Sequence, residues 1–489
     1  MNEEVRQLEP TAVWNHFADL NSVPRASKKE ERVIEFAKSF GEGLGLETMV
    51  DAVGNVIIRK PASAGMEDRM PVVMQSHLDM VHQKNSDSDF DFASQGIEMF
   101  VEGDWVKARG TTLGADNGMG VASIMTILAS NEIAHPAMEA LFTIDEETGM
   151  TGAQGLEGGL LSGKILLNLD TEEDNELTIG CAGGCDVTAT GSYQSESAPD
   201  GSTGYRVTVR GLTGGHSGVD IHLGRANSNK LMNRFLWAAS QACGVRVATI
   251  DGGSLRNAIP RESVATLVCT KSDAGKVEEV ANAVREQLLA EYATTDPNLE
   301  LVLEAIDTPN KVMPATLQQR LLAAIYGCPC GIHRMCPDIE GLVQTSNNLA
   351  RVQLEGGEFT IMCLTRSSVN SERDDLANAI KAVLELANAD VSVNGSYPGW
   401  QPAPSSDIVK LMSDVYGELF GESPHVAACH AGLECGIIGR NYPDMDMISF
   451  GPTIRGAHSP DERVKVSSVQ KYWRFLIETL RQIPSTNGV

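Results

Sequence analysis

The chain has 489 residues and carries 39 Lys and Arg residues against 65 Asp and Glu residues, a net charge of −26 at pH 7. This length exceeds what one hydrophobic core organises, and the acidic balance argues against nucleic acid or an anionic membrane as partner. The acidic start, MNEEVRQLEP, lacks signal-peptide features and no apolar run approaches about 20 residues, so we expect a cytoplasmic protein without a membrane span.

The first third of the chain alternates helical and strand-like segments. Apolar residues at three- and four-residue steps predict helices, and short apolar runs predict strands that are buried on both faces. This alternation is typical of an α/β domain with a mostly parallel sheet covered by helices. The predicted helices are 11–20, 28–44 and 119–129, and the predicted strands are 54–59, 71–81, 104–108, 137–147 and 164–170.

After residue 186 the pattern changes to half-exposed strands in the order strand, helix, strand, strand, helix, strand. This order is typical of an antiparallel sheet with helices on one face, and a further block of strands and helices follows it. The predicted strands are 205–212, 245–250, 257–270, 299–305, 342–354 and 358–368, and the predicted helices are 225–242, 276–292, 314–326 and 371–387.

The Pro- and Ser-rich segment PGWQPAPSSD marks a return to the first domain. Ser406 is expected to cap a helix that ends at Gly421, and residues 445–451 read as a further strand. We therefore predict a discontinuous catalytic metal-binding domain, residues 1–186 and 398–489, interrupted by an inserted α+β lid domain, residues 187–397.

Carboxylates and imidazoles follow several of the predicted strands of the first domain. Because the carboxyl ends of parallel strands meet at one edge of a sheet, these side chains are expected to converge there. Carboxylates crowded at one edge repel one another unless cations lie between them, so the sequence predicts a metal site. A single His-x-Asp tripeptide is a weak motif that also occurs in solvated loops, and the repetition of acidic strand ends favours the metal. The side chains are His77, Asp79, Asp145, Glu146, Glu147, Asp170 and His458, with Asp116 in a Gly-flanked turn before a long apolar helix.

Two neighbouring divalent ions need a shared ligand, and we predict that Asp116 is this bridge. His77 and Asp170 would complete one site, and Glu147 and His458 would complete the other. Two nitrogen ligands with three carboxylates suit zinc, with manganese or cobalt as alternatives.

The remaining acids at this edge have predicted catalytic roles. Glu146 is predicted to be the general base that deprotonates a water held by the metal pair and then delivers the proton to the leaving nitrogen. Asp79 is predicted to orient His77, although a simple turn-forming Asp is the alternative.

The ten cysteines are sparse for this length, and most are expected to be reduced core thiols. Cys181 and Cys185 are expected to line a tight turn. A structural zinc at Cys328, Cys330, His333 and Cys336 is a weaker alternative to core or turn positions, because their spacing is not a common zinc pattern.

The motifs His77-Leu-Asp79, Asp116-Asn-Gly, Glu146-Glu147, Asp170 and His458 resemble, in type and order, those of the co-catalytic zinc peptidases. This family includes peptidase T, glutamate carboxypeptidase and the aminoacylases. KARGTTLGADNG, GGHSG, RNAIPRE, YPGWQP, HAGLECG and FGPTIRGAHSPDE extend the resemblance over nearly the whole chain, with a particular likeness to aminoacyl-histidine dipeptidases. The resemblance implies hydrolysis of dipeptides, preferentially aminoacyl-histidine dipeptides such as carnosine.

The resemblance also implies roles for residues of the lid domain. His216 would polarise the scissile carbonyl, Asn257 would contact substrate, and Arg366 would hold the terminal carboxylate of the substrate. Gly432 would let the backbone approach the substrate. The alternatives are a tight turn at GGHSG and pairing of Arg366 with Glu355 or Glu358.

Other readings remain open from the sequence. A deacylase of N-acyl amino acids could use the same metal core, and an inactive metal-binding scaffold is a third possibility that the presence of Glu146 disfavours. His430 and Glu434 could pair on one helix face because they are four residues apart. A homodimer through the lid domain is compatible with the resemblance.

Overall fold

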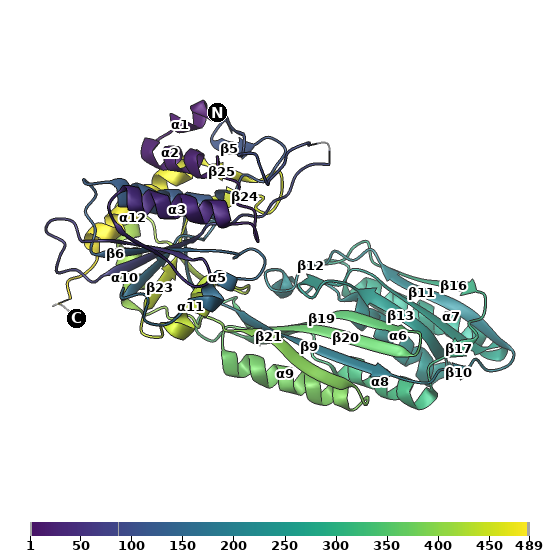
Figure 1. The fold of residues 1–489 in the computed structure, drawn as a ribbon. Helices are drawn as coiled ribbons and strands as arrows, with labels where there is room; N and C mark the ends of the chain where they lie inside the picture. The colour runs from purple at the N-terminus through teal and green to yellow at the C-terminus, as the bar shows by residue number, and fades with distance from the viewer. Residues whose placement is uncertain (1, 87, 487–489) are drawn as a thin grey trace. The chain divides into compact units, whose positions relative to one another are not determined.

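The computed structural model describes residues 2–86 and 88–486 and divides into two compact units (Figure 1). Unit 1 comprises the described residues of 1–180, 400–428 and 433–489, and unit 2 comprises residues 181–399 and 429–432. The divisions lie near the predicted positions 186/187 and 397/398 without coinciding with them. Residues 429–432 group with unit 2, whereas the sequence assigned them to the first domain.

Unit 1 is built on an eight-stranded sheet in the order β1-β2-β6-β3-β7-β23-β8-β22. The central strands β6, β3, β7 and β23 are mutually parallel, while β1, β2 and β8 pair antiparallel to their neighbours. The α/β fold with a mostly parallel sheet is therefore confirmed. The strands are β1 (Glu47–Val50), β2 (Val56–Lys60), β3 (Val72–His77), β6 (Met138–Thr143), β7 (Ile165–Asn168), β8 (Glu176–Cys181), β22 (His425–Cys429) and β23 (Asp446–Ser449).

Every residue of β3, β6 and β7 is buried, which is why these segments are continuous apolar runs in the sequence. A small four-stranded sheet in the order β24-β25-β5-β4 accompanies the main sheet. Its strands are β4 (Met99–Glu102), β5 (Trp105–Ala108), β24 (Ile454–Arg455) and β25 (Arg463–Lys465).

The helices of unit 1 follow the predicted apolar periodicity. In α2 (Thr11–Leu20) the residues Val13, Trp14 and Phe17 form a buried stripe, and burying such side chains stabilises the fold by about 1.5–3 kcal/mol each. As predicted, the Ser406 hydroxyl accepts the Val409 N–H at the start of α10 (Asp407–Phe420), and Gly421 is the C-cap of this helix. The other helices are α1 (Glu3–Arg6), α3 (Glu31–Gly43), α4 (Ala115–Ala129), α5 (Thr151–Gly155), α10 (Asp407–Phe420), α11 (Glu434–Asn441) and α12 (Val466–Gln482).

Unit 2 contains a nine-stranded antiparallel sheet in the order β16-β11-β15-β13-β19-β20-β9-β21, with β18 paired to β19. The two predicted blocks therefore form one sheet, because β13 pairs with β19. The strands are β9 (Gly183–Ser192), β11 (Ser202–Arg210), β13 (Arg246–Gly253), β15 (Ser263–Thr270), β16 (Glu300–Ile306), β18 (Gly331–Met335), β19 (Val343–Glu355), β20 (Glu358–Ser367) and β21 (Asp390–Tyr397).

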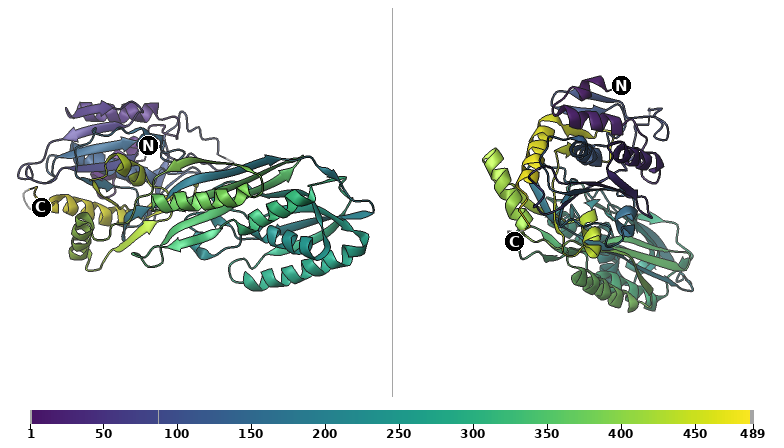
Figure 2. Two further views of the ribbon diagram at one scale, coloured as in Figure 1. Left: turned by 90° about the horizontal axis from the view of Figure 1, so that it is seen from below. Right: turned by 60° about the vertical axis from the view of Figure 1, so that its left-hand side comes forward.

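The long helices of unit 2 lie on the same side of this sheet (Figure 2). The core between the two layers includes Phe235, Leu236, Val247 and Leu267. The helices are α6 (Ser228–Cys243), α7 (Ala274–Glu291), α8 (Ala315–Gly327) and α9 (Asn370–Glu385), with short 3-10 turns η1 (Ile221–Leu223) and η2 (Lys271–Asp273). Short strand pairs join β10 (Glu196–Ser197) to β17 (Lys311–Val312) and β12 (Gly215–His216) to β14 (Ala258–Ile259).

Two local predictions are wrong. Residues 257–270 form β14 and β15 instead of one strand, since Pro260 lies between them and has no N–H for a ladder hydrogen bond. Cys181 and Cys185 lie in β8 and β9 and not in a tight turn. A side chain at Gly183 would collide with the backbone of Gly399, so close backbone packing explains the glycines here.

Candidate metal centre

The parallel strands of unit 1 bring their polar residues to one edge. His77 ends β3, Glu146 and Glu147 follow β6, and Asp170 follows β7. Since β3 lies between β6 and β7 in parallel register, the three segments leave the sheet side by side. In each segment a buried apolar strand is followed by a polar turn, and this order brings the polar side chains to the same edge of the sheet.

Asp116 lies at the centre of the converging side chains. Its Oδ1 is 3.3 Å from Nε2 of His77, and its Oδ2 is 3.3 Å from Nε2 of His458. His77 Nε2 is also 3.5 Å from Oδ1 of Asp170, and His458 Nε2 is 3.0 Å from Oε2 of Glu147. The two oxygens of Asp116 thus face two different sets of potential ligands.

These side chains fit a pair of divalent cations. The ligand atoms of His77, Asp116 and Asp170 lie within 4.8 Å of one another, and so do those of Asp116, Glu147 and His458. The structure brings together all five residues that the sequence put forward as ligands, in the predicted division around Asp116. Imidazole nitrogens with carboxylate oxygens suit zinc, and they also suit other first-row divalent metals.

The electrostatics of this edge favour extra positive charge. The hydrogen bonds of His458 with Asp116 and Glu147 raise the pKa of its imidazole to about 11. Burial raises the pKa of Asp170 to about 6, and the nearby carboxylates of Asp116 and Glu147 add to that shift. Protons therefore compensate the crowded carboxylates, which is the task that metal cations would take over.

The His77 ring has the orientation that a metal ligand requires. Its Nδ1 lies 3.1 Å from the carbonyl oxygen of Asp79 and 3.4 Å from the Asp79 carboxylate. A proton on Nδ1 leaves the Nε2 lone pair directed toward Asp116 and Asp170. Asp79 contacts His77 as predicted, with its backbone oxygen as the nearer acceptor.

The Asp79 carboxylate has a further contact that the sequence did not reveal. It accepts the backbone N–H groups of Glu146 at 3.0 Å and Glu147 at 3.3 Å, and the Ser27 hydroxyl at 2.8 Å. Burial opposes ionisation of Asp79, but its hydrogen bonds with His77 and Ser27 outweigh burial and lower its pKa to about 2. An ionised Asp79 therefore holds the turn that presents both glutamates.

Glu146 lies at the same edge, in a group with His77 and Glu147. Burial raises the pKa of Glu146 well above its usual value, and the negative charges of Asp170 and Glu434 add to this effect. A carboxylate with a raised pKa is suited to accept a proton at neutral pH.

In unit 2, His216 lies in β12 with a defined tautomer. Its Nδ1 accepts the backbone N–H groups of Gly218 at 3.2 Å and Val219 at 3.0 Å. The ring proton must therefore be on Nε2. Burial and the nearby charge of Arg366 lower the pKa of His216, so the ring is a neutral hydrogen-bond donor through Nε2.

Arg366 is buried in unit 2 beside neutral partners. Its Nη1 donates to the Tyr397 hydroxyl at 3.0 Å, and its Nε donates to the Ser217 hydroxyl at 3.4 Å. Arg366 lies opposite Ser346 in the β19–β20 pair, whereas Glu355 and Glu358 lie opposite each other at its other end, which disagrees with pairing of Arg366 to either glutamate. A buried guanidinium without a counter-ion is suited to bind an anion.

Asn257 and Gly432 have fewer described contacts. Asn257 is exposed before β14, and its carbonyl accepts the Ser217 N–H at 2.8 Å, which ties it to the His216 segment. Gly432 lies in unit 2 just before α11. The structure thus places Asn257, His216 and Arg366 in one unit with Gly432.

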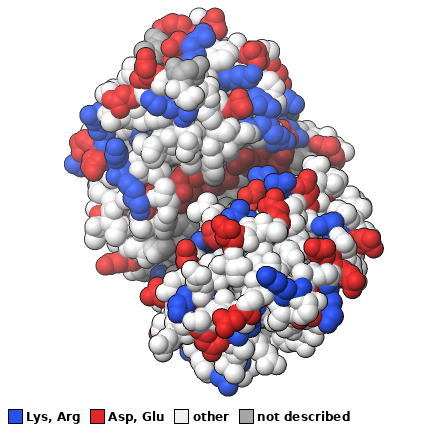
Figure 3. Space-filling view, turned by 90° about the vertical axis from the view of Figure 1, so that its right-hand side faces the viewer, with Lys and Arg blue, Asp and Glu red and all other residues white. Residues whose placement is uncertain are grey.

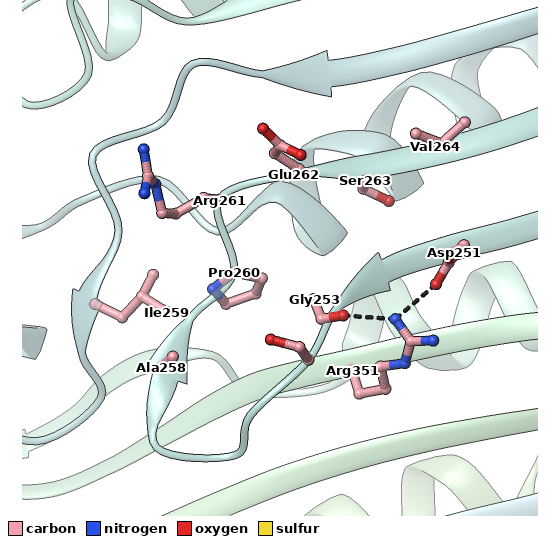
Figure 4. A pocket seen from close by; sticks show the side chains of 11 residues that line it. Asp251, Gly253, Ala258, Ile259, Pro260, Arg261, Glu262, Ser263, Val264 and Arg351 are labelled. Carbon is pink, nitrogen blue, oxygen red and sulfur yellow. Dashed lines mark hydrogen bonds and ion pairs between the residues drawn. The ribbon is translucent and has the colours of Figure 1, made fainter. Parts of the chain in front are cut away.

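A cavity of about 510 Å³ lies beyond Asn257 in unit 2 (Figure 4). Arg351 forms an ion pair with Asp251 at 2.6 Å there and donates to the Gly253 carbonyl at 2.5 Å. None of the predicted site residues lines this cavity, so we do not assign the site to it.

The Cys328 segment does not resemble a zinc site. The Cys328 thiol lies 4.0 Å from the Cys363 thiol, and Asn227 donates to Cys330. Among the described residues, Cys328, Cys330, His333 and Cys336 form no group of three ligands. Cys328, Cys330, Cys336 and Cys363 are free thiols, in agreement with the expected reduced state.

The suggested pairing of His430 with Glu434 is wrong. His430 precedes α11 and lies 2.8 Å from the Ser346 hydroxyl in unit 2. Glu434 begins α11 in unit 1 and accepts hydrogen bonds from Gln75 at 2.6 Å and Thr143 at 2.7 Å. The two residues are not on one helix face, since the helix begins only at Glu434.

The surface charge is mixed. On the face in Figure 3, the described Lys and Arg residues alternate with Asp and Glu residues and form no continuous basic patch. None of the described helices combines the length and the apolar character that a membrane crossing requires.

Comparison with known proteins places this geometry in a family. Residues 73–482 match the model of peptidase family M20/M25/M40. The chain is 42% identical over 482 residues to the cytosol non-specific dipeptidase of Escherichia coli strain K12, covering 99% of both chains. The crystal structure of an aminoacylhistidine dipeptidase from Vibrio alginolyticus matches with a TM-score of 0.93 and 43% identity over 99% of both chains. Aminopeptidase PepT from Bacillus cereus shares the fold at 15% identity and a TM-score of 0.57, with 97% and 99% of the two chains covered. The chain belongs to peptidase family M20/M25/M40.

Proposed function

We propose that the chain is a metal-dependent dipeptidase that hydrolyses dipeptides, preferentially those with a carboxyl-terminal histidine. The observation that carries this proposal is the pair of ligand groups that share Asp116, with Glu146 at the same edge. His77, Asp116 and Asp170 would hold one ion, and Asp116, Glu147 and His458 would hold the other. When bound, the two divalent cations supply Lewis-acid activation of water and of the scissile carbonyl.

Glu146 is the proposed general base. Its high proton affinity lets the carboxylate take a proton from the attacking water and return it to the leaving nitrogen. Asp79 assists by fixing the Glu146–Glu147 turn through two backbone hydrogen bonds. The position of the Glu146 carboxylate is therefore set by the hydrogen bonds between Asp79 and the backbone of this turn.

Residues of unit 2 are proposed to bind the substrate. The Nε2–H of His216 would donate to the carbonyl oxygen of the scissile bond, because its Nδ1 is occupied as an acceptor. The Arg366 guanidinium would bind the terminal carboxylate of a dipeptide. Asn257 would contact the substrate, and Gly432 would let the protein backbone approach it.

The substrate class is tested with purified, metal-loaded protein. We expect hydrolysis of free dipeptides and a higher kcat/KM for β-alanyl-histidine and glycyl-histidine than for glycyl-leucine. N-acetyl-histidine separates this proposal from an N-acyl amino acid deacylase. Faster cleavage of N-acetyl-histidine than of any dipeptide would refute the dipeptidase proposal, and equal rates for all dipeptides would refute only the histidine preference.

The role of Arg366 is tested by Arg366→Ala. Loss of a charge-assisted hydrogen-bonding pair should raise KM for free dipeptides about 10- to 100-fold. The same change should leave hydrolysis of a dipeptide amide unaffected, because the amide has no terminal carboxylate. Arg351→Ala is the matched control in unit 2, since Arg351 already pairs with Asp251. An unchanged KM for free dipeptides in Arg366→Ala would remove Arg366 from the carboxylate site.

Zinc is the proposed metal, with manganese and cobalt as the comparison metals for reconstitution. We propose a cytosolic location because the Escherichia coli relative is named a cytosol dipeptidase.

The proposed assembly is a homodimer through unit 2. Light scattering measures the mass of the protein in solution, and a monomer at micromolar concentration would contradict this proposal.

A further inference from the structure

The Glu462 side chain is buried and receives an unusual set of hydrogen bonds. Its Oε2 accepts the backbone N–H groups of Leu113 at 2.7 Å and Gly114 at 2.9 Å. Its Oε1 accepts those of Ala115 at 2.7 Å and Asp116 at 3.2 Å. Four consecutive backbone donors therefore meet one carboxylate that comes from a segment almost 350 residues later in the chain.

These four N–H groups belong to the turn that leads into α4, and those of Gly114, Ala115 and Asp116 are among the first N–H groups of that helix. The first N–H groups of a helix have no carbonyl partner in the helix, and they carry partial positive charge. No side chain next to the helix caps α4, whose N-cap residue is Gly114. The Glu462 carboxylate satisfies these donors, although the backbone of Asp116 and Asn117 departs from helical angles before the regular part of α4 begins.

Arg25 holds the same turn from its carbonyl side. Its Nη2 donates to the Gly114 carbonyl at 2.5 Å, and its Nη1 donates to the carbonyls of Leu78 and Asp79 at 3.1 Å each. Arg25 is 2% exposed, so these bonds are shielded from water. Arg25 thus connects the turn before Asp116 with the segment after His77.

The conformation of the turn favours glycine at position 114. Gly114 has a φ of 70°, in the left-handed region, and a Cβ there would collide with Nη2 of Arg25. The backbone of Gly114 is therefore fixed on both sides, by a carboxylate at its N–H and by a guanidinium at its carbonyl.

Glu462 also belongs to the loop that carries His458. The strands β24 and β25 pair on either side of residues 456–462, and Glu462 directly precedes β25. Within the loop, the Ser459 N–H donates to the Gly456 carbonyl at 3.2 Å and the Glu462 N–H donates to the Ser459 carbonyl at 3.0 Å. One carboxylate therefore fixes the distance between the His458 loop and the Asp116 turn.

We propose that Glu462 is a positioning residue of the metal centre, which together with Arg25 clamps the Asp116 turn and sets it against His458. The proposal rests on the proposed function in one respect, that Asp116 and His458 are metal ligands. Glu462 acts through the backbone of Asp116 and touches neither the metal nor the substrate.

The test compares zinc affinity in two variants that both remove a buried carboxylate. In Glu462→Gln, an amide NH₂ group replaces one of the two carboxylate oxygens. Two backbone N–H groups of the Asp116 turn then lose their acceptor, so this turn should shift. Glu139→Gln is the matched control in the same unit: Glu139 is 4% exposed and accepts the N–H groups of Ser162 at 2.7 Å and Gly163 at 2.9 Å. Glu139 is at the start of β6, whereas Glu146 and Glu147 follow the other end of that strand.

Metal-free protein is titrated with Zn²⁺ against a chromophoric chelator, and the thermal midpoint of each variant is measured. Glu462→Gln should lower zinc affinity about 10- to 100-fold, the usual effect of losing a residue that orients a ligand. Glu139→Gln should lower the thermal midpoint and leave zinc affinity within about twofold, because the backbone donors that it leaves unsatisfied are remote from the ligands. If Glu462→Gln does not fold, Glu462→Asp carries the same comparison, since it keeps the charge but cannot span all four donors.

Two results would overturn the proposal. One is wild-type zinc affinity in the folded Glu462 variant, and the other is an equal loss of affinity in Glu139→Gln. A wild-type protein that binds no zinc would overturn both this proposal and the proposed function. A wild-type protein that binds two zinc ions but hydrolyses no dipeptide would refute the proposed function alone, because the affinity comparison uses zinc without substrate.

Discussion

Glu146 and Glu147 are neighbours with different surroundings. The Glu147 carboxylate lies 3.0 Å from Nε2 of His458 in a group that contains Asp116. Burial raises the pKa of Glu146 well above its usual value. These surroundings support the proposal that Glu147 binds metal and Glu146 transfers the proton.

Glu146→Gln should lower kcat by about 10²- to 10⁴-fold while the protein keeps its bound metal, since only the proton acceptor is lost. Glu147→Gln should instead lower the metal content and recover part of its activity with excess metal. Metal analysis and steady-state kinetics on both variants measure the two effects. Loss of metal from Glu146→Gln together with retention in Glu147→Gln would reverse the assignment.

The sequence predicted the candidate ligands that directly follow strands. It did not predict Glu462, which contacts the Asp116 turn from a segment distant in the sequence. His77, Asp170 and Glu147 stand directly after apolar runs, so local patterning predicts their convergence. The Glu462 side chain binds backbone N–H groups of the Asp116 turn, and the spacing of residues in the sequence does not predict such a contact. The acid in GAHSPDE is the only local signal, since it lies four residues after His458.

At the scale of secondary-structure elements, the three strands that carry the metal centre are joined by buried side chains. Gln75 in β3 donates to the Thr143 hydroxyl in β6 at 3.0 Å, and Asn168 in β7 donates to Gln75 at 2.5 Å. Thr143 in turn donates to Glu434 of α11 at 2.7 Å. Polar bonds thus fix the strands shortly before each strand reaches its ligand.

Thr143→Val should lower the free energy of unfolding by about 1–3 kcal/mol, because Glu434 and Gln75 would each lose a buried partner. Thr126→Val is the control: the Thr126 hydroxyl is also buried and donates to the Ala122 carbonyl in its own helix, at 2.8 Å. Chemical denaturation of both variants measures the difference. Equal losses would show that the bonds between the strands contribute nothing beyond a local hydroxyl.

The elements themselves were predictable where periodicity was strong. Helix α2 spans Thr11–Leu20 as predicted, and the fully buried β3, β6 and β7 follow from uninterrupted apolar runs. Strands β9, β18 and β21 were missed, because they contain glycines, charged residues or exposed positions and lack a continuous apolar pattern. The pairing of β13 with β19 joins the two predicted blocks into one sheet. No local sequence pattern predicts a pairing between strands so far apart in the chain.

At the scale of the whole molecule, the candidate metal centre is predicted to make stability depend on pH and on bound cations. Without metal, the folded state binds extra protons at Asp170, whose pKa is raised to about 6, and at His458, whose pKa is raised to about 11. A raised pKa stabilises the fold below the pKa of the unfolded chain, and this stabilisation is lost as pH rises through the folded value. The metal-free protein should therefore lose stability as pH rises from about 4 toward 8.

Cations should reverse this trend. Metal ligands must be deprotonated, so zinc binds and stabilises more strongly as pH rises. The thermal midpoint of the chelator-treated protein should fall between pH 5 and pH 7.5, while that of the zinc-loaded protein should rise over the same range. Parallel curves with and without zinc would show that the ions do not bind to these groups.

The most direct test of the central claim is the position of bound zinc in a crystal, located by anomalous scattering at the zinc edge. We predict two peaks in unit 1, one among His77, Asp116 and Asp170 and the other among Asp116, Glu147 and His458, with Asp116 touching both. A single peak, or zinc bound away from Asp116, would contradict a metal pair bridged by that carboxylate.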